Sequence, residues 1–207
     1  MGVVTVEDLI HRIKRVHNAL DNRKKSDLSD IKPIITKDQN GYYVEVSFSR
    51  DDDQAELDNK VNTLIGNIAK IKDHLKQHCK LNDIADGKEI EQIIDTSPDM
   101  KIIITLDNID KHGLPLRGSP RCEFIPILKN IKTLLALSTG TSSSGAASIT
   151  FGLTAIKANT SESGNASLII NGDIYNEESG QKVATLLDTC SKAIALWEST
   201  LKSYGIM

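Results

Sequence analysis

The sequence has few aromatic residues and no closely spaced cysteines. Phe, Trp and Tyr make up 4% of its 207 residues, and Trp197 is the single tryptophan. Because proteins that bind single strands by stacking bases need aromatic platforms, we do not expect that class. Cys79, Cys122 and Cys190 lie far apart and form no CxxC pair. We therefore expect neither a disulfide framework nor a cysteine zinc site.

Long apolar runs and the common nucleotide-binding motifs are also missing. No stretch is apolar over the roughly 20 residues that a membrane helix needs, and the start lacks the pattern of a signal peptide. We expect a cytoplasmic protein that does not contact the membrane. GxGxxG, GxxxxGK[ST] and GxSxG are absent, so we expect no nucleotide cofactor and no nucleophile-elbow hydrolase. The net charge of −3 shows no basic excess, although it leaves room for a local basic site.

A regular apolar pattern from Gln54 to Lys80 predicts one long helix. Its apolar residues recur every three or four positions, at Leu57, Val61, Leu64, Ile68, Ile71 and Leu75. That spacing places them in one stripe along a helix of roughly 40 Å, at about 1.5 Å per residue. Near its C-terminal end the helix carries three titratable residues, Asp73, His74 and His78.

Further helices are predicted on both sides of this long helix. Apolar spacing indicates helices over residues 5–22, 88–95, 126–137 and 181–204. Thr5 is a suitable N-cap for the first of these helices. Arg12, Lys14 and Arg15 give that helix a basic side, which is more often a solvated face than a phosphate contact.

The segment from Pro98 to His112 has conflicting signals. The run Lys101–Thr105 is rich in β-branched residues and favours a strand on propensity alone. Ser97 is a good N-cap, however, with proline in the first turn, and Gly113 fits a C-terminal cap. We therefore predict a helix from Pro98 to His112.

Two β-hairpins complete the predicted architecture. The first joins Ile34–Thr36 to Tyr42–Phe48 through an Asn-Gly turn, and the second joins residues 149–154 to residues 167–171. The fold class predicted is α+β and mostly α, with a helical bundle core, two hairpins and a long C-terminal helix. We expect a core over residues 1–140, with an inserted hairpin at about 34–48. Residues 141–207 would pack on the same core.

A metal site is one interpretation of His74 and His78, which lie four residues apart on one helix face. That geometry offers two imidazoles to zinc, but the zincin signature also needs a Glu beside the first His, where this sequence has Leu75. A third ligand would have to come from elsewhere, such as His112 or Asp110. A pair of surface histidines is the commoner explanation.

A second interpretation rests on the segments NIAKIKDH, residues 67–74, and LDNIDKH, residues 106–112. A helix ending in Asp-His that is followed by a helix ending in Asp-Lys-His resembles helical domains of the bacterial HEPN superfamily. The resemblance covers residues 54–112. It implies a helical core that pairs as a homodimer. Active members are metal-independent ribonucleases, often in toxin–antitoxin and anti-phage systems, and their motif is an Arg, a polar residue and a later His.

The resemblance implies specific roles in this sequence. Asn108 and His112 match the polar residue and the histidine, whereas Asp107 stands where the motif has its arginine. In such a site a histidine near neutral pKa moves protons while an arginine holds the phosphate. Arg117 or Arg121 would then have to supply the positive charge from the following loop.

A structural role is the alternative for the same residues. Asp110, Lys111 and His112 would end their helix, where cations are favoured by the dipole, and Asp73 with His74 would bond to that end. We expect a binding protein of a defence or toxin-like system, with a protein or RNA as partner. A ribonuclease that uses His112, and a metal-binding protein that uses His74 and His78, are the alternatives.

Overall fold

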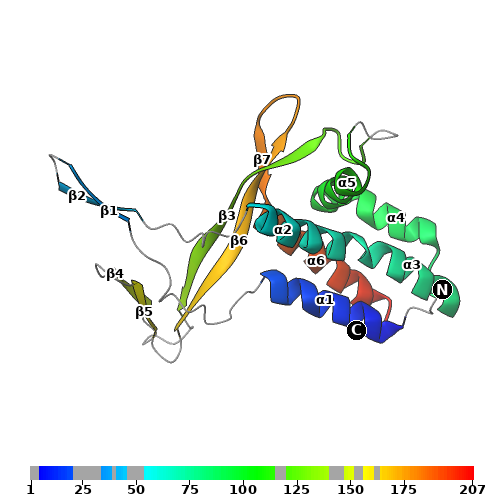
Figure 1. The fold of residues 1–207 in the computed structure, drawn as a ribbon. Coiled ribbons are helices and arrows are strands. Elements are labelled where there is room, and N and C mark those ends of the chain that lie inside the picture. The colour runs from blue at the N-terminus through cyan, green and yellow to red at the C-terminus, as the bar shows by residue number, and fades with distance from the viewer. Residues whose placement is uncertain are drawn as a thin grey trace. The chain divides into compact units, whose positions relative to one another are not determined.

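The computed structural model describes residues 5–20, 34–38, 41–45, 54–114, 120–139, 147–151, 156–160 and 164–207. In this part of the chain the fold is α+β and mostly α, as predicted (Figure 1). The helices are α1 Val6–Leu20, α2 Gln54–Ala69, α3 Ile71–Asn82, α4 Gly87–Asp95, α5 Pro98–His112 and α6 Leu186–Ser203. The strands are β1 Ile34–Asp38, β2 Gly41–Glu45, β3 Pro126–Thr139, β4 Ala147–Phe151, β5 Ile156–Thr160, β6 Gly164–Asn176 and β7 Lys182–Thr185.

The chain forms two compact units, and neither is continuous in sequence. The first contains Met1–Leu20, Ala55–Ile131 and Asn171–Met207, and the second contains Asp21–Gln54 and Lys132–Ile170. All helices of the described residues belong to the first unit, including the C-terminal α6. The boundary expected near residue 140 falls inside the second unit. Across the described residues, no helix has the length and apolar character to cross a membrane.

The single helix predicted from Gln54 to Lys80 is wrong in one respect, because the structure divides it at Lys70 into α2 and α3. The interruption is local: the Lys70 N–H donates to the carbonyl of Gly66 at 3.0 Å, and the Lys70 carbonyl accepts from the His74 N–H at 3.3 Å. The predicted apolar stripe is buried along both helices, at Leu57, Val61, Leu64, Ile68, Ile71 and Leu75.

Trp197 on α6 lies at this junction and has no exposed surface. Its indole N–H donates to the backbone carbonyl of Ile68 at 3.1 Å, one residue before the end of α2. A carbonyl near a helix end has spare acceptor capacity, and the indole uses it. The same face of α6 buries Leu186, Cys190, Ile194 and Leu201, and α6 packs against α1 and α5.

The start of α6 differs from the prediction. A helix was expected from residue 181, but Lys182–Thr185 form β7, which pairs antiparallel with β6. Val183, which falls within the helix predicted over residues 181–204, lies on this strand and is 43% exposed. The strand forms because β6 offers a partner, and the turn around Gly180, at φ 65°, brings the chain back to it.

Helix α5 confirms the prediction for residues 98–112, caps included. The Ser97 hydroxyl accepts a hydrogen bond from the Met100 N–H at 3.2 Å, and Gly113 adopts φ 71° after the last turn. The β-branched run within it is buried in the helical core at Ile102, Ile103, Ile104 and Thr105. Packing and capping therefore outweigh the strand propensity of this segment.

The helix predicted over residues 126–137 is wrong, because these residues form strand β3. The strand lies beside β6 in a sheet of order β3-β6-β7. Asn130 adopts φ 54° within it, and its side-chain amide donates to the Asp173 carboxylate of β6 at 2.9 Å. The apolar spacing suited either element, and the partner strand that decides between them lies some forty residues later.

One predicted hairpin is confirmed over the described residues and the other has the wrong partner; residues 46–48 and 152–154 of the predicted strands lie outside the described residues. β1 pairs antiparallel with β2, with Ile34 opposite Glu45. The strand expected at residues 149–154 is β4, but it pairs antiparallel with β5 and not with residues 167–171, which belong to β6. Alternation of apolar residues fixes the two faces of a strand but does not choose its partner.

Replacing Trp197 by Phe tests the junction between α2 and α3. We expect Trp197→Phe to lower the free energy of unfolding by about 2–3 kcal/mol, because it removes a buried hydrogen bond and leaves a cavity. Urea unfolding followed by far-ultraviolet circular dichroism measures this change. Tyr204→Phe, at the half-buried end of α6, is the control and should cost under about 1 kcal/mol. Equal losses in both variants would contradict the special role of the indole.

Candidate functional site

A polar cluster lies where α1 packs against α3. Helix α1 begins with a reciprocal cap, in which the Thr5 hydroxyl accepts from the Asp8 N–H at 3.2 Å and the Thr5 N–H donates to the Asp8 carboxylate at 2.8 Å. Leu9, Ile13 and Val16 form its buried stripe. Arg12 lies at the edge of that stripe, half-buried, and its side chain reaches α2 and α3.

The guanidinium of Arg12 contacts two side chains from distant parts of the sequence. Its Nη1 donates to Asn67 Oδ1 at 3.0 Å, and its Nη2 lies 3.5 Å from His74 Nε2. An arginine side chain only donates, so His74 Nε2 must present its lone pair and the ring proton must sit on Nδ1. We name Arg12, Asn67 and His74 the arginine–histidine cluster. It holds His74 as a neutral imidazole.

The cluster is incomplete as a hydrogen-bond network. Arg12 Nε and His74 Nδ1 are both buried and have no hydrogen-bond partner in the structure. No carboxylate of the described residues forms an ion pair with Arg12. Leaving a buried donor unsatisfied costs on the order of 1–3 kcal/mol. Among the described residues, the hydrogen-bond partners of the Arg12 guanidinium are thus a neutral amide and an imidazole.

The charges around the cluster explain the titration of its members. Burial lowers the pKa of Arg12 and the pKa of His74. Arg15 lowers the pKa of Arg12 further, and Arg12 and Lys70 lower the pKa of His74 further. Asp8 opposes these effects at both residues, but it is exposed, and hydrogen bonds from Thr5 lower the pKa of its carboxyl. Burial and Arg12 are therefore the largest influences on His74, and the carboxylates of Asp8 and Asp73 oppose them.

His112 and Asn108, the predicted histidine and polar residue, do not join this cluster. Both are exposed near the C-terminal end of α5. That end lies beside the first half of α2, because Asn62 donates to the Asp110 carboxylate at 2.7 Å. His74 follows Asn62 by twelve positions, or roughly 18 Å at 1.5 Å per residue. The structure thus brings His74 to Arg12 and not to His112.

The other residues of the predicted α5 site have structural partners. Lys111 forms an ion pair with Asp107 one turn before it, and the Asp107 side chain is buried against Gly66 of α2. Asp107, which stands where the HEPN motif has an arginine, therefore helps to fix α5 on α2. Asp73 is exposed and lies 3.7 Å from Lys72.

Arg121 has carboxylate partners on α4. Its Nε donates to the Asp95 carboxylate at 2.8 Å, its Nη2 binds Glu91, and Glu91 also binds Lys76 of α3. These bonds raise the pKa of Arg121 against the opposing effect of burial. An arginine neutralised by two carboxylates is poorly suited to hold a phosphate. Arg117 lies outside the described residues.

His74 and His78, the predicted metal-binding pair, have different neighbours. His78 is 8% exposed, and its ring Nδ1 lies 3.4 Å from the side-chain amide of Asn82, while His74 faces the guanidinium of Arg12. A cation at His74 would be repelled by Arg12. Within the residues that the structure describes, no three His, Cys, Asp or Glu side chains are grouped as a metal site would require.

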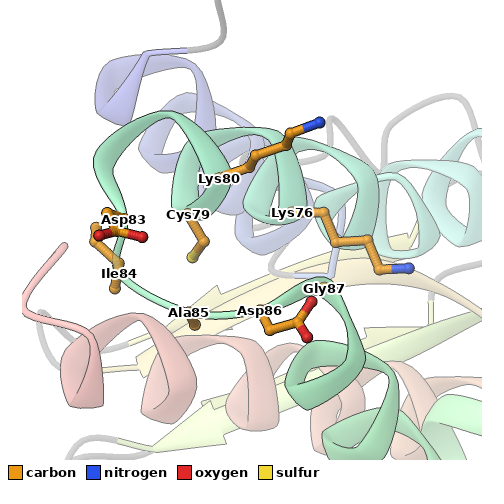
Figure 2. Close-up of a pocket in the computed structure, with 8 residues that line it drawn as sticks. All are labelled: Lys76, Cys79, Lys80, Asp83, Ile84, Ala85, Asp86 and Gly87. Atoms are coloured by element: carbon orange, nitrogen blue, oxygen red, sulfur yellow. The ribbon is translucent and has the colours of Figure 1, made fainter.

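A separate pocket of about 630 Å³ lies at the corner between α3 and α4 (Figure 2). Figure 2 shows Cys79 facing the connecting loop, whereas the Lys80 side chain extends away from it. Burial raises the pKa of the Cys79 thiol, which makes it a poor nucleophile. Asp83 and Asp86 line this pocket together with Lys76 and Lys80, so it carries two acidic and two basic side chains.

No family model, curated protein or solved structure matches this chain. The arginine–histidine cluster is therefore interpreted from its own geometry. Sequence patterns pointed to His74 and to the basic side of α1, but they did not join Arg12 to Asn67 and His74. Arg12 is 55 positions before Asn67 and 62 positions before His74, so no local pattern joins them. Only the packing of their helices brings the three side chains together.

The partly buried His74 and its contact with Arg12 predict a pH-dependent stability. Its pKa in the folded protein lies below the ordinary value of 6.5. As the pH falls through that value the unfolded chain takes up a proton that the folded protein resists, so stability decreases towards acid. We expect His74→Gln to reduce this acid-side decrease, measured by urea unfolding at pH values between about 5 and 8. His112→Gln, at an exposed histidine, should leave it unchanged; a reduction of equal size there would refute the assignment.

Proposed function

We propose that this protein is an RNA-binding protein with a HEPN-like helical core, and that the arginine–histidine cluster is its phosphate contact. The observation that carries the proposal is the half-buried guanidinium of Arg12, which has no carboxylate partner among the described residues and one buried N–H without an acceptor. Its Nη groups contact only an amide and an imidazole, and the forked donors of a guanidinium match a phosphodiester.

The surroundings of Arg12 favour a chain of phosphates over a single small anion. Arg15 lies near enough to act on the charge of Arg12, and Lys70 acts on His74, so each residue has a further cation near it besides the carboxylates of Asp8 and Asp73. Asn67 holds the guanidinium in place from α2 without neutralising it. A polyanion meets several such cations at once, and its affinity grows with each phosphate it contacts.

The role that we propose in a bacterial defence or toxin-like system follows from the HEPN resemblance. The arginine–histidine cluster changes which residues would contact RNA in that role. His74 ends the segment NIAKIKDH that carries part of the resemblance, and it lies beside Arg12, away from the LDNIDKH segment. A non-catalytic member of such a system would act by holding RNA. Its helical core would supply the contact from α1 and from the α2–α3 pair.

Replacing Arg12 by Gln tests the proposed contact. Gln keeps part of the aliphatic stem and a donor for Asn67 but removes the charge. We expect about a 10- to 100-fold loss of affinity for a short oligouridylate, because charge-assisted hydrogen bonds contribute about 1.5–3 kcal/mol. Fluorescence anisotropy at fixed low salt measures the affinity.

Lys14→Gln is the matched control for Arg12→Gln, because it removes one exposed positive charge from the same helix. We expect it to weaken binding only by the general effect of one surface charge, less than about threefold. Equal losses in the two variants would show that net charge, and not the cluster, attracts RNA. Absence of binding by the wild-type protein would refute the proposed function itself.

A second candidate function is metal-independent cleavage of RNA, favoured by the neutral His74 beside Arg12. When the guanidinium turns its donors to a phosphate, His74 Nε2 is freed to accept the proton of a ribose 2′-hydroxyl. The 2′-oxygen then attacks phosphorus, a 2′,3′-cyclic phosphate forms as the bond to the 5′-oxygen breaks, and the 5′-oxygen takes up a proton from water. General base catalysis of this kind contributes about 10²–10⁴-fold to the rate.

Cleavage of RNA in the presence of EDTA tests this candidate. We expect His74→Gln to lower the cleavage rate at least about 10²-fold and His112→Gln to leave it unchanged, because only His74 is placed beside an unpaired arginine. Gel analysis with end-labelled RNA measures the rate. If activity is lost in His112→Gln and kept in His74→Gln, the catalytic histidine is the one at the end of α5. If no cleavage occurs, the protein is a binder only.

A further inference from the structure

We propose that the arginine–histidine cluster takes up one proton when a phosphodiester binds, so that mild acid strengthens RNA binding. The inference rests on the proposed function and adds its regulation. Arg12 Nη2 lies 3.5 Å from His74 Nε2. In the free protein that contact needs the lone pair of Nε2. A proton on Nε2 would remove the acceptor and place two cations against each other.

A bound phosphate reverses this preference. One anionic oxygen near the cluster accepts from the Arg12 guanidinium and from a protonated His74 Nε2 together. The repulsion between two cations is then replaced by two attractions to the same anion, and both bonds are charge-assisted. The anion also reduces the cost of burying the positive ring. The complex therefore favours the imidazolium, whereas the free protein favours the neutral imidazole.

Other charged groups around His74 act in both directions. Those facing it from α1 are Asp8 and Arg12, with His11 and Arg15 further along the same helix, and those of its own segment are Lys70 and Asp73. Helix α4 packs on another side of α3, where Glu91 binds Lys76 and Glu89 acts on Cys79. In the free protein, burial and Arg12 are the largest influences on the pKa of His74, and both lower it.

Proton uptake at His74 determines how the affinity for a phosphodiester depends on pH. Affinity is constant at high pH, where His74 is neutral in both states. It rises as the pH falls through the pKa of His74 in the complex, by about tenfold for each pH unit. It levels off below the pKa of His74 in the free protein, which lies under 6.5. A phosphodiester keeps one charge throughout this range, whereas a phosphate monoester titrates near 6, so a diester is the suitable probe.

The test measures the affinity for a short oligouridylate with a pH-insensitive label, from pH 8 to about 5 at constant ionic strength. We expect the wild-type protein to gain about tenfold or more towards acid. His74→Gln, which offers Arg12 an uncharged acceptor, should lose most of that gain. His112→Gln is the control for the general rise in positive charge, and it should keep the gain. Circular dichroism checks that each variant is folded.

Two results separate this inference from the proposed function. Binding that depends on Arg12 but has the same pH dependence in the wild-type protein and in His74→Gln would overturn the proton uptake and leave RNA binding intact. Absence of binding at every pH would overturn both. As a direct measurement, NMR titration of the His74 ring should give a higher pKa with the oligouridylate than without it; an unchanged or lower pKa would refute the inference.

Discussion

The hydrogen bond from the Trp197 indole to the Ile68 carbonyl is the constraint on which the helical unit depends. It joins the C-terminal helix to the last turn of α2, next to the interruption at Lys70. A fully buried indole needs an acceptor, and few backbone carbonyls in a helical core have capacity to spare. The end of α2 offers one. The bond therefore sets both the depth of α6 in the core and the point from which α3 departs.

The arginine–histidine cluster is a consequence of this arrangement. α6 packs against α1 as well as supporting the α2–α3 junction, and His17 of α1 lies 2.6 Å from Glu198 of α6. Arg12 and His74 thus meet because their two helices are both held near one end of α6. Neither residue is placed by its local sequence alone. The site depends on helices that are distant in sequence and share one support.

The elements that were predicted correctly are those with local determinants. Helix α5 has its N-cap, its proline and its final glycine within the segment, so its limits were predictable to the residue. Strand β3 and strand β7 depend on β6 for their hydrogen bonds, and no local pattern shows that partner. In the candidate site, too, only the part with a local signal was predictable. His74 was identifiable from its segment, whereas its pairing with Arg12 required the packing of α1.

The contrast between two arginines supports an external ligand for the cluster. Arg121 and Arg12 are both partly buried at helix contacts, yet Arg121 is neutralised by Glu91 and Asp95 whereas Arg12 meets only an amide and an imidazole. The fold can therefore supply carboxylates to a partly buried guanidinium, and it does so where the role is structural. At Arg12 it supplies neutral acceptors and leaves one donor unused. Desolvating a cation without neutralising it is costly, and an anion bound at Arg12 would offset that cost.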